Sequence, residues 1–324
     1  MVFDNHRQFN CIKIYMRNFY INAPIVFFIF KRPEQTFQVF QAIREAKPTK
    51  LYVIADGSNN HKDAQKCYET RKIMDSIDWE CTVMKNFSET NLGLRKRIVS
   101  GLDWVFAQEE IAIILEDDCL PDLSFFYYCQ ELLEKYKDDQ RIGIISGDLF
   151  LKGLDNENSY YFSNFPHIWG WATWKRTWEN YDSSIKDWPQ FRNPDWLTEK
   201  TGSEYYARIW LNIFDRVHQQ EIDTWDYQVA FMLWIQSQLS IVPNRNLVSN
   251  IGFGAESTHT KNASDRFSSI PAEKMVFPLI HPRLICRDLE NDLLEARVIF
   301  GSSTTQSKNI LIKLKSIFGN IFNV

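Results

Sequence analysis

The sequence of 324 residues has no excess of basic charge: 37 Lys and Arg stand against 41 Asp and Glu, a net charge of −4. No basic stripe runs through the chain, so nucleic acid is not expected among its partners. Its six cysteines form neither a Cys-x-x-Cys pair nor a Cys/His group with zinc spacing, which disfavours a zinc-organised fold. Scattered cysteines in a chain of this size indicate a reducing compartment, and we expect a cytoplasmic protein.

Segments typical of membrane insertion or export are also missing. The apolar run at 23–30 is far shorter than the ~20 residues that a membrane-spanning helix needs. Residues 1–22 mix charged and aromatic side chains without an apolar centre, so they lack the pattern of a signal peptide and are interpreted as an N-terminal lead-in. Residues 310–322 are apolar with interspersed lysines, which fits either a basic amphipathic helix on a membrane surface or a terminal helix docked on the domain.

Phosphate-binding glycine motifs are absent too. The 12 glycines form no Gly-x-Gly-x-x-Gly pattern and no Gly-x-x-x-x-Gly-Lys-Ser/Thr pattern, so a nucleotide bound here must be held by other groups. The chain is 44% hydrophobic and 15% aromatic, enough to bury the core of one large domain or of a domain with a smaller appendage.

Short apolar runs alternate with helical patterns over the first part of the chain. The expected strands are residues 25–30, 51–55, 80–84, 111–115 and 142–146, and the expected helices begin near residues 33, 62, 94 and 121. Such alternation predicts an α/β fold with a mainly parallel sheet flanked by helices on both faces. The pattern then changes to an aromatic-rich second half with a β-like run at 160–162 and helices at 203–221 and 224–238.

Three adjacent acids, Glu116, Asp117 and Asp118, end the buried run at 111–115. They are therefore expected at the carboxyl end of a parallel strand, where open α/β sheets bind ligands. Adjacent carboxylates repel one another and need a cation or separate donors, and hard oxygens suit Mg²⁺ or Mn²⁺ bound together with substrate phosphates. The alternative is a solvated acidic turn in which Asp122 only caps the following helix.

A second acid, Asp226, is expected in the first turn of the helix at 224–238, with Asp223 or Thr224 as its cap. It is followed by apolar residues that predict a buried helix face, so its carboxylate could lie in a cleft and take a proton from a substrate hydroxyl. The alternative is an acid that only stabilises the helix N-terminus through the helix dipole.

The order of these features resembles a GT-A fold glycosyltransferase, with the acidic triplet as the DxD-type motif. The sequence Leu115-Glu-Asp-Asp118 before a Phe-rich helix is similar to the N-acetylglucosaminyltransferases that start complex N-glycans. The segments at 169–174 and 250–254 are more similar to bacterial relatives encoded with surface-polysaccharide genes. The resemblance covers about residues 23–260.

This resemblance implies roles for the residues of the first half. Asp118 would bind the Mn²⁺ or Mg²⁺ ion, while Glu116 and Asp117 would orient the site and contact the ribose or sugar of the donor. Asp56 would face the nucleotide base, a uracil in the relatives, and Arg32 would help to frame the base or phosphates. The alternative for Asp56 is a simple Asp-Gly turn.

Arg95 and Arg97 occupy the place where such enzymes approach the donor. They lie two residues apart on an expected helix and so do not share a face, and we expect one to point inward and the other to be solvated. His259 would reach the metal or the diphosphate, although a lone histidine is often structural.

The resemblance also implies roles for the second half. Asp226 would be the catalytic base, and Trp169 or His167 would reach the donor or acceptor cleft. We expect Trp171 and Trp174 to be structural, with Gly170 allowing a close approach of the backbone.

The expected function is metal-dependent transfer of a sugar, with inversion, from a UDP-sugar to a hydroxyl of a glycan or lipid-linked acceptor in bacterial surface-polysaccharide synthesis. The expected division is a lead-in at 1–22, a nucleotide-sugar half at 23–150, an acceptor half at 151–265 and a C-terminal extension at 266–324 that could touch the inner face of the cell membrane. The alternatives are a sugar-nucleotide nucleotidyltransferase, which residues 30–33 disfavour because they contain no glycine, and a non-catalytic sugar-binding or scaffold protein.

Overall fold

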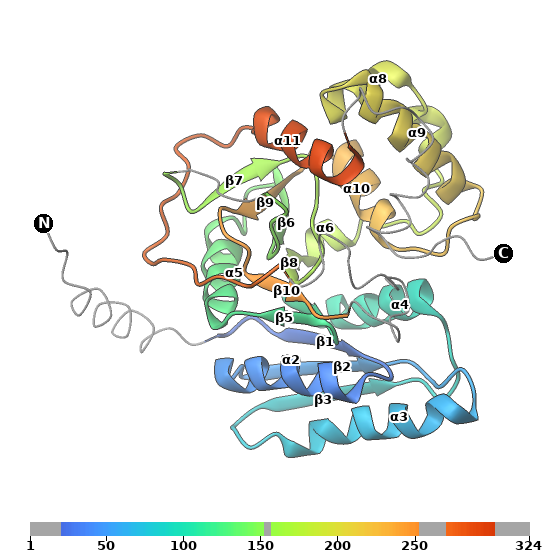
Figure 1. Ribbon diagram of the computed structural model, residues 1–324, viewed down its shortest axis with the longest axis vertical. Helices are drawn as coiled ribbons and strands as arrows, with labels where there is room; N and C mark the ends of the chain where they lie inside the picture. The colour runs from blue at the N-terminus through green and yellow to red at the C-terminus, as the bar shows by residue number, and fades with distance from the viewer. Residues whose placement is uncertain (1–20, 152–156, 253–269, 302–324) are drawn as a thin grey trace, which may run out of the picture.

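The computed structural model describes residues 21–151, 157–252 and 270–301. Its centre is an eight-stranded sheet in the order β3-β2-β1-β4-β8-β6-β9-β7, accompanied by a two-stranded sheet of β10 and β5 (Figure 1). The strands of the large sheet are β1 (Ile25–Ile29), β2 (Lys50–Ala55), β3 (Thr82–Phe87), β4 (Ile111–Glu116), β6 (Ile142–Ser146), β7 (Tyr160–Ser163), β8 (Trp171–Trp174) and β9 (Leu239–Pro243).

The first four strands of this sheet, in the order β3-β2-β1-β4, are all parallel, which is a Rossmann-like arrangement. Every residue of β1 is buried, because alternate side chains face opposite sides of the sheet and both sides are covered. Val26 and Phe28 belong to the core that includes helix α4 (Leu94–Phe106), and Phe27 belongs to the core that includes α2 (Pro33–Ala46) and α5 (Leu123–Lys135).

The other half of the sheet is mixed. Strand β8 lies antiparallel between β4 and β6, β9 runs parallel to β6, and β7 is antiparallel to β9. Among the described residues, four of the seven pairings in the large sheet are parallel. The predicted α/β fold with a mainly parallel sheet and helices on both faces is therefore confirmed.

The helices of the second half cover one face of the sheet and carry much of the aromatic content. They are α6 (Lys175–Trp178), α7 (Trp188–Phe191), α8 (Pro194–Thr201), α9 (Glu204–His218), α10 (Asp226–Ile235) and α11 (Leu289–Phe300). Trp210 of α9 and Trp234 of α10 meet edge to face with ring centroids 4.9 Å apart. The same apolar cluster contains Val26 and Ile114, so the two halves of the chain share one core.

Several element boundaries differ from the sequence prediction. The third strand occupies residues 82–87 rather than 80–84, and the helix expected from residue 62 to residue 77 is α3 (His61–Lys72) followed by the 3₁₀ turn η1 (Ile73–Ser76). Strands β8 and β9 were not predicted as strands. Each is short and obtains its hydrogen bonds from partners distant in sequence, which local patterns do not reveal.

Two short strands close over the acidic turn. Strand β5 (Cys119–Pro121) pairs antiparallel with β10 (Val248–Asn250), which places Asn250 opposite Cys119. Asp122 caps α5 by accepting a hydrogen bond from the Ser124 amide at 2.8 Å, so the helix begins at Leu123 and not at residue 121, and Asp122 has the capping role named in the alternative interpretation. The pairing of β5 with β10 therefore holds the residues that directly follow the acidic turn.

Within 21–151, 157–252 and 270–301, no helix combines the length and apolar character that crossing a membrane requires. The amphipathic segment expected at 310–322 lies outside the described residues. The part of the C-terminal extension that is described includes α11, whose Asp292 accepts a hydrogen bond from Ser163 of β7 at 2.5 Å.

Candidate active site

Two cavities meet at the acidic turn. The first, which we call the sheet cavity, lies at the carboxyl ends of β1, β2 and β4, and the second, the aromatic cavity, lies under α10 and α11. Both are lined by Arg32, Leu94, Glu116, Asp118 and Asp223, and these five residues form their shared wall.

Arg32, which follows β1, contacts two of the three adjacent acids at the end of β4, a pairing that the sequence did not predict. The Arg32 guanidinium nitrogen Nη1 lies 3.2 Å from Asp117 Oδ1 and 2.5 Å from Asp118 Oδ2. The Phe30 amide also donates a hydrogen bond to Asp117 Oδ2 at 3.1 Å. Burial lowers the pKa of Arg32, but Asp118 and Asp117 outweigh this effect and raise it overall, so the guanidinium stays charged.

Glu116 is less well compensated than its neighbours. In the part of the chain that the structure describes, no side chain donates a hydrogen bond to its carboxylate. Removal from water raises the pKa of Glu116 to about 8, and the negative charges of Asp118 and Asp117 act in the same direction. Burial likewise raises the pKa of Asp117 to about 7, although Arg32 opposes the shift. Among the described residues, the three carboxyl groups of this wall thus share the single guanidinium of Arg32, which leaves Glu116 without a compensating cation.

The donor set fits a hard divalent cation held jointly with a ligand. No three His, Cys, Asp or Glu side chains among the described residues form a complete metal cage. Magnesium sites commonly use one or two carboxylates and complete their coordination with substrate phosphates and water. The described residues that line the sheet cavity include five acids, with Arg32 and Arg97 as the bases, so a diphosphate would need added positive charge to bind beside them. Glu116 and Asp118, which face both cavities, are the residues that would hold the cation.

The segment after β10 packs directly on Asp118. The Ile251 amide donates a hydrogen bond to the Asp118 carbonyl oxygen at 2.8 Å, and a Cβ atom at Gly252 would overlap the Asp118 carboxylate. Only glycine permits this approach, which accounts for one of the glycines of the segment at 250–254. His259, predicted as a metal ligand, lies outside the described residues.

Asp56 has a clear structural task at the edge of the sheet cavity. Its carboxylate accepts hydrogen bonds from three backbone amides, those of Gly57 at 2.9 Å, Leu92 at 2.9 Å and Gly93 at 3.0 Å. Asn91 adds a hydrogen bond from its side chain to the Gly57 carbonyl at 2.9 Å. The carboxylate thus ties the end of β2 to the loop that precedes α4, and both sides of this joint line the sheet cavity.

The two arginines of α4 point in different directions. Arg97 is buried, donates hydrogen bonds to the Asn86 carbonyl and side-chain oxygens at 2.5 and 2.8 Å, and lines the sheet cavity. Arg95 forms an ion pair with Asp223 at 3.2 Å and a hydrogen bond with Gln220 at 2.9 Å. Arg95 therefore links α4 to the loop before α10. We expected one of the two arginines to be solvated, but the structure pairs both with protein groups.

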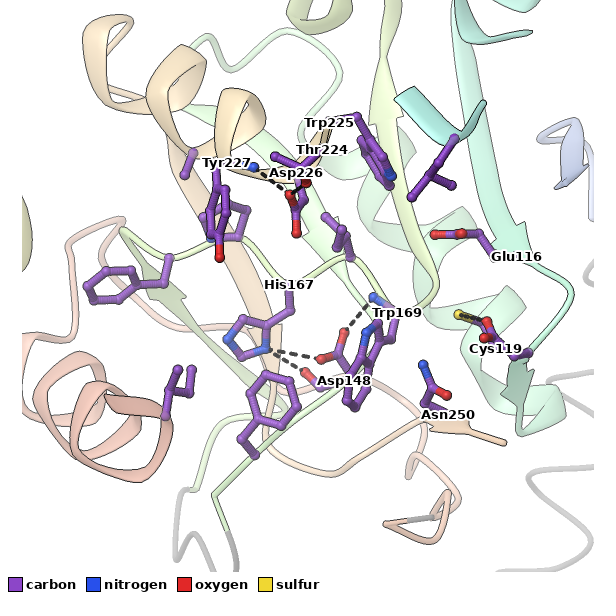
Figure 2. A pocket seen from close by; sticks show the side chains of 18 of the residues that line it. Glu116, Cys119, Asp148, His167, Trp169, Thr224, Trp225, Asp226, Tyr227 and Asn250 are labelled. Atoms are coloured by element: carbon purple, nitrogen blue, oxygen red, sulfur yellow. Dashed lines mark hydrogen bonds and ion pairs between the residues drawn. The ribbon is translucent and has the colours of Figure 1, made fainter. Parts of the chain in front are cut away.

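Asp226 is the first residue of α10 and opens onto the aromatic cavity (Figure 2). The prediction that Asp223 or Thr224 caps α10 is wrong, since Trp225 occupies the N-cap position and its side chain makes no capping hydrogen bond. The Thr224 hydroxyl donates its hydrogen bond to Asp226 Oδ1. The Tyr227 amide donates to the same oxygen at 2.9 Å, and Figure 2 shows the other oxygen directed into the cavity. Burial raises the pKa of Asp226, which makes its carboxylate a stronger base.

Trp169 and His167 both line the aromatic cavity, and they lie next to an acid that sequence reasoning missed. The Trp169 amide donates a hydrogen bond to Asp148 Oδ1 at 3.1 Å. His167 lies between Asp148 and Glu295, with Nε2 3.1 Å from Glu295 Oε2 and Nδ1 3.0 Å from the Asp148 carbonyl oxygen. Asp148 comes two residues after β6, and an acid just after a predicted strand is a signal from which it could have been found. Nothing in the sequence connects Glu295 with this site.

The other tryptophans of the segment are packing residues, as predicted. Trp171 stacks on Trp225 with ring centroids 5.8 Å apart, and the Trp174 indole donates a hydrogen bond to the Leu133 carbonyl at 3.2 Å. Gly170 has a φ of +74° and its carbonyl accepts a hydrogen bond from the Gly147 amide at 2.8 Å, which confirms the expected close approach.

Comparison with known proteins adds little to this geometry. No protein-family model matches the chain, and no curated protein matches its sequence. Among solved structures, 4-diphosphocytidyl-2C-methyl-D-erythritol synthase from Anaerococcus prevotii aligns with 49% of this chain and 76% of its own, at 11% identity and a TM-score of 0.32. UDP-glucose pyrophosphorylase complexed with UDP-glucose aligns with 49% of this chain and 78% of its own, at 10% identity and a TM-score of 0.29. At these values the likenesses do not assign a function.

The fold and the site together define a class. The chain is an α/β protein with a Rossmann-like parallel half and a mixed aromatic half, and an acidic wall at the carboxyl edge of the sheet separates two cavities.

Proposed function

We propose that this chain is a metal-dependent glycosyltransferase of the GT-A type that moves a sugar from a nucleotide-diphosphate donor to a hydroxyl acceptor. One observation carries the proposal: the acidic wall of Glu116 and Asp118 faces both cavities, and Asp226 opens onto one of them. A transfer reaction needs a place for the donor, a place for the acceptor and a charged junction between them, and the two cavities supply this arrangement.

The sheet cavity is the proposed donor site. It lies outside the carboxyl ends of parallel strands, where open α/β sheets bind nucleotides. Asp56, Asn59 and Arg97 contribute polar groups along this cavity, and Arg32 lies at the junction where the diphosphate would bind. A divalent cation held by Glu116 and Asp118 would neutralise charge on the leaving diphosphate.

The aromatic cavity is the proposed acceptor site, with Asp226 as the base. Asp226 takes the proton from the acceptor hydroxyl as the acceptor oxygen bonds to the anomeric carbon of the donor sugar. The bond from that carbon to the diphosphate oxygen breaks, and the electron pair leaves with the diphosphate. Attack from the side opposite the leaving group inverts the anomeric centre. The raised pKa of Asp226 supports this role because a stronger base accepts the proton more readily.

The identity of the substrates rests on the sequence resemblance alone. It favours a UDP-sugar donor, Mn²⁺ or Mg²⁺ as the metal, a glycan or lipid-linked acceptor and a place in bacterial surface-polysaccharide synthesis at the cytoplasmic face of the membrane. Trp169, which the resemblance places in the donor or acceptor cleft, lines the aromatic cavity, so we assign it to the acceptor.

The experiment compares nucleotide binding with product formation. Thermal shifts of the purified protein are measured with UDP, GDP, CDP and dTDP, each with Mn²⁺ and with EDTA, for the unmodified chain, Asp118→Asn and the control Asp138→Asn. Asp138 is exposed and distant from both cavities. A ligand that binds the folded state raises its apparent stability. We expect a Mn²⁺-dependent shift with one nucleotide, loss of this shift in Asp118→Asn, and no loss in the control.

The products distinguish the proposed enzyme from its rivals. A glycosyltransferase releases the nucleoside diphosphate from a nucleotide-sugar, whereas a nucleotidyltransferase releases pyrophosphate from a nucleoside triphosphate and a sugar phosphate. The two residues between Phe30 and Pro33, where α2 begins, are both basic and leave no glycine-rich loop for a triphosphate. Pyrophosphate release would favour the nucleotidyltransferase, and nucleotide binding without either product would favour a binding protein.

A further inference from the structure

The charges around the aromatic cavity exclude part of the possible acceptor chemistry. Among the residues that the structure describes, its lining contains five acids, and the bases are Arg32 and His167. Arg32 already pairs with Asp117 and Asp118, and His167 already contacts Glu295. An acceptor that carried a carboxylate or phosphate would therefore find no basic side chain among the described lining residues that is not already engaged with an acid, and an unpaired charge is unfavourable in a partly buried cavity.

The rest of the lining suits an uncharged sugar ring. Trp169, Phe150, Trp210 and Tyr227 contribute aromatic surface, and Trp169 meets Phe150 edge to face with centroids 5.1 Å apart. Sugar rings have apolar C–H faces and polar hydroxyl edges, so a cavity with aromatic walls and carboxylates matches both parts of a neutral sugar.

A buried charged group lies behind the Trp169 wall. Asp148, His167 and Glu295 are 1%, 4% and 0% exposed, and the His167 imidazole lies between the other two, 3.6 Å from Asp148 Oδ2 and 3.1 Å from Glu295 Oε2. Burial lowers the pKa of His167, but Glu295 and Asp148 raise it to about 10, so the imidazole carries a proton. Its single positive charge faces two acids.

These three buried residues are not expected to contribute much to the stability of the fold. Asp148 Oδ2 and Glu295 Oε1 are buried and have no hydrogen-bond partner among the described residues. Buried charges cost several kcal/mol each unless they are fully paired, and well-packed apolar residues of similar volume are often at least as stable. The three residues do, however, fix the cavity wall: Asp148 Oδ1 holds the Trp169 backbone, and the His167 ring lies 4.9 Å from the Phe150 ring.

We propose that the aromatic cavity takes an uncharged sugar ring against Trp169, and that Asp148, His167 and Glu295 are positioning residues that hold this wall. The inference rests on the proposed function, because it names the acceptor class of the same site. Trp169 contacts the substrate, and the buried group acts only through it and Phe150.

The test uses paired glycosides that differ only in charge. Methyl glucoside and methyl galactoside are compared with methyl glucuronide and methyl galacturonide by ligand-observed NMR in the presence of UDP and Mn²⁺. Aromatic contacts are worth roughly 0.5–1.5 kcal/mol. The expected results are at least tenfold weaker binding of the uronides to the unmodified chain and about two- to thirteenfold weaker binding of neutral glycosides to Trp169→Ala, most of it recovered in Trp169→Phe.

Asp148→Asn tests the positioning role, since asparagine retains an oxygen for the Trp169 amide and removes the charge. This variant is expected to bind glycosides more weakly. Its thermal shift with UDP is expected to equal that of the unmodified chain and of the control Asp138→Asn. General destabilisation would not weaken one ligand's binding and leave the other's unchanged. The inference is overturned if the uronides bind as well as the neutral glycosides, if none of the four binds, or if Trp169→Ala binds them unchanged. A missing UDP shift with intact glycoside binding would instead count against the proposed transferase and leave this subsite standing.

Discussion

The two halves of the molecule build their parts of the site by different means. In the parallel half, Asp56 follows β2 and Glu116 ends β4, two parallel strands on either side of β1, so the regular sheet alone brings them to one edge. In the aromatic half, Asp148, Asp226 and Glu295 come from segments distant in sequence, and packing of helices on a mixed sheet brings them together. The first arrangement follows from strand order, whereas the second depends on tertiary contacts.

The two halves also compensate buried charge differently. In the parallel half, the Arg32 guanidinium bridges Asp117 and Asp118, and Asp56 is satisfied by backbone amides. In the aromatic half, the protonated His167 lies between two acids that each retain an oxygen without a hydrogen-bond partner among the described residues. With the exception of Glu116, the acids of the parallel half are therefore hydrogen-bonded more completely than Asp148 and Glu295 are.

The largest expected effect is that of Asp226→Asn, which should lower the rate of sugar transfer without changing nucleotide binding. Asp226→Asn keeps the shape of the side chain and the acceptor oxygen for the Tyr227 amide but removes the base. Since a positioned general base contributes about 10²–10⁴-fold, we expect sugar transfer to fall by that factor. The UDP shift should stay, because Asp226 lines only the aromatic cavity. If Asp226→Asn transfers sugar at the rate of the unmodified chain, Asp226 is not the catalytic base.

The buried His167 of the aromatic half is expected to contribute to the pH dependence of the free energy of unfolding. The folded pKa of His167, about 10, lies above its ordinary value of 6.5, so its contribution to stability is complete below 6.5 and is lost as the pH rises through 10. One proton changes the free energy of unfolding by at most about 1.4 kcal/mol per pH unit. We expect His167→Gln to flatten the loss of stability between pH 7 and 9, measured by urea unfolding.

The control for this measurement is Arg44→Gln, which removes a cation of the parallel half that pairs with Asp78. Pairing raises the pKa of Arg44 and lowers the pKa of Asp78, so both stay charged between pH 7 and 9, and this variant should not change the slope of stability with pH. Equal slopes in the unmodified chain and His167→Gln would show that the histidine is neutral in the folded protein.

The smallest expected effect compares one glycine from each half. Gly170 has a φ of +74°, and a Cβ atom there would lie 2.7 Å from Val248 Cγ2. Gly101, in α4, has a helical conformation, and its Cβ atom would lie 2.7 Å from the Phe28 ring. Alanine at Gly101 recovers helix propensity of roughly 1 kcal/mol, whereas alanine at Gly170 adds backbone strain of about 1–3 kcal/mol to a similar clash. Chemical denaturation should therefore show Gly170→Ala as the less stable variant by about 1 kcal/mol or more; the reverse order would mean that the φ at residue 170 is not a constraint.

Much of the parallel half could be predicted because its information is local. The run at 25–30 became β1 with a difference of one residue, and Pro33 begins α2 as expected. Fully buried strands consist of continuous apolar residues, and helices show their own period and caps, so neither requires knowledge of distant partners. The acidic triplet was found for the same reason, since it interrupts such a run.

The sequence by itself determined the α/β class, the edge at which the acids lie and the candidates Asp118 and Asp226. Only the tertiary structure decided that Arg32 pairs with Asp117 and Asp118, that Arg95 turns to Asp223, and that Trp169 faces the aromatic cavity. The contact of His167 with Glu295 joins residues 128 positions apart. Such contacts depend on how β8 and α11 pack, and the energy of that packing comes from burial of surfaces that no local pattern specifies.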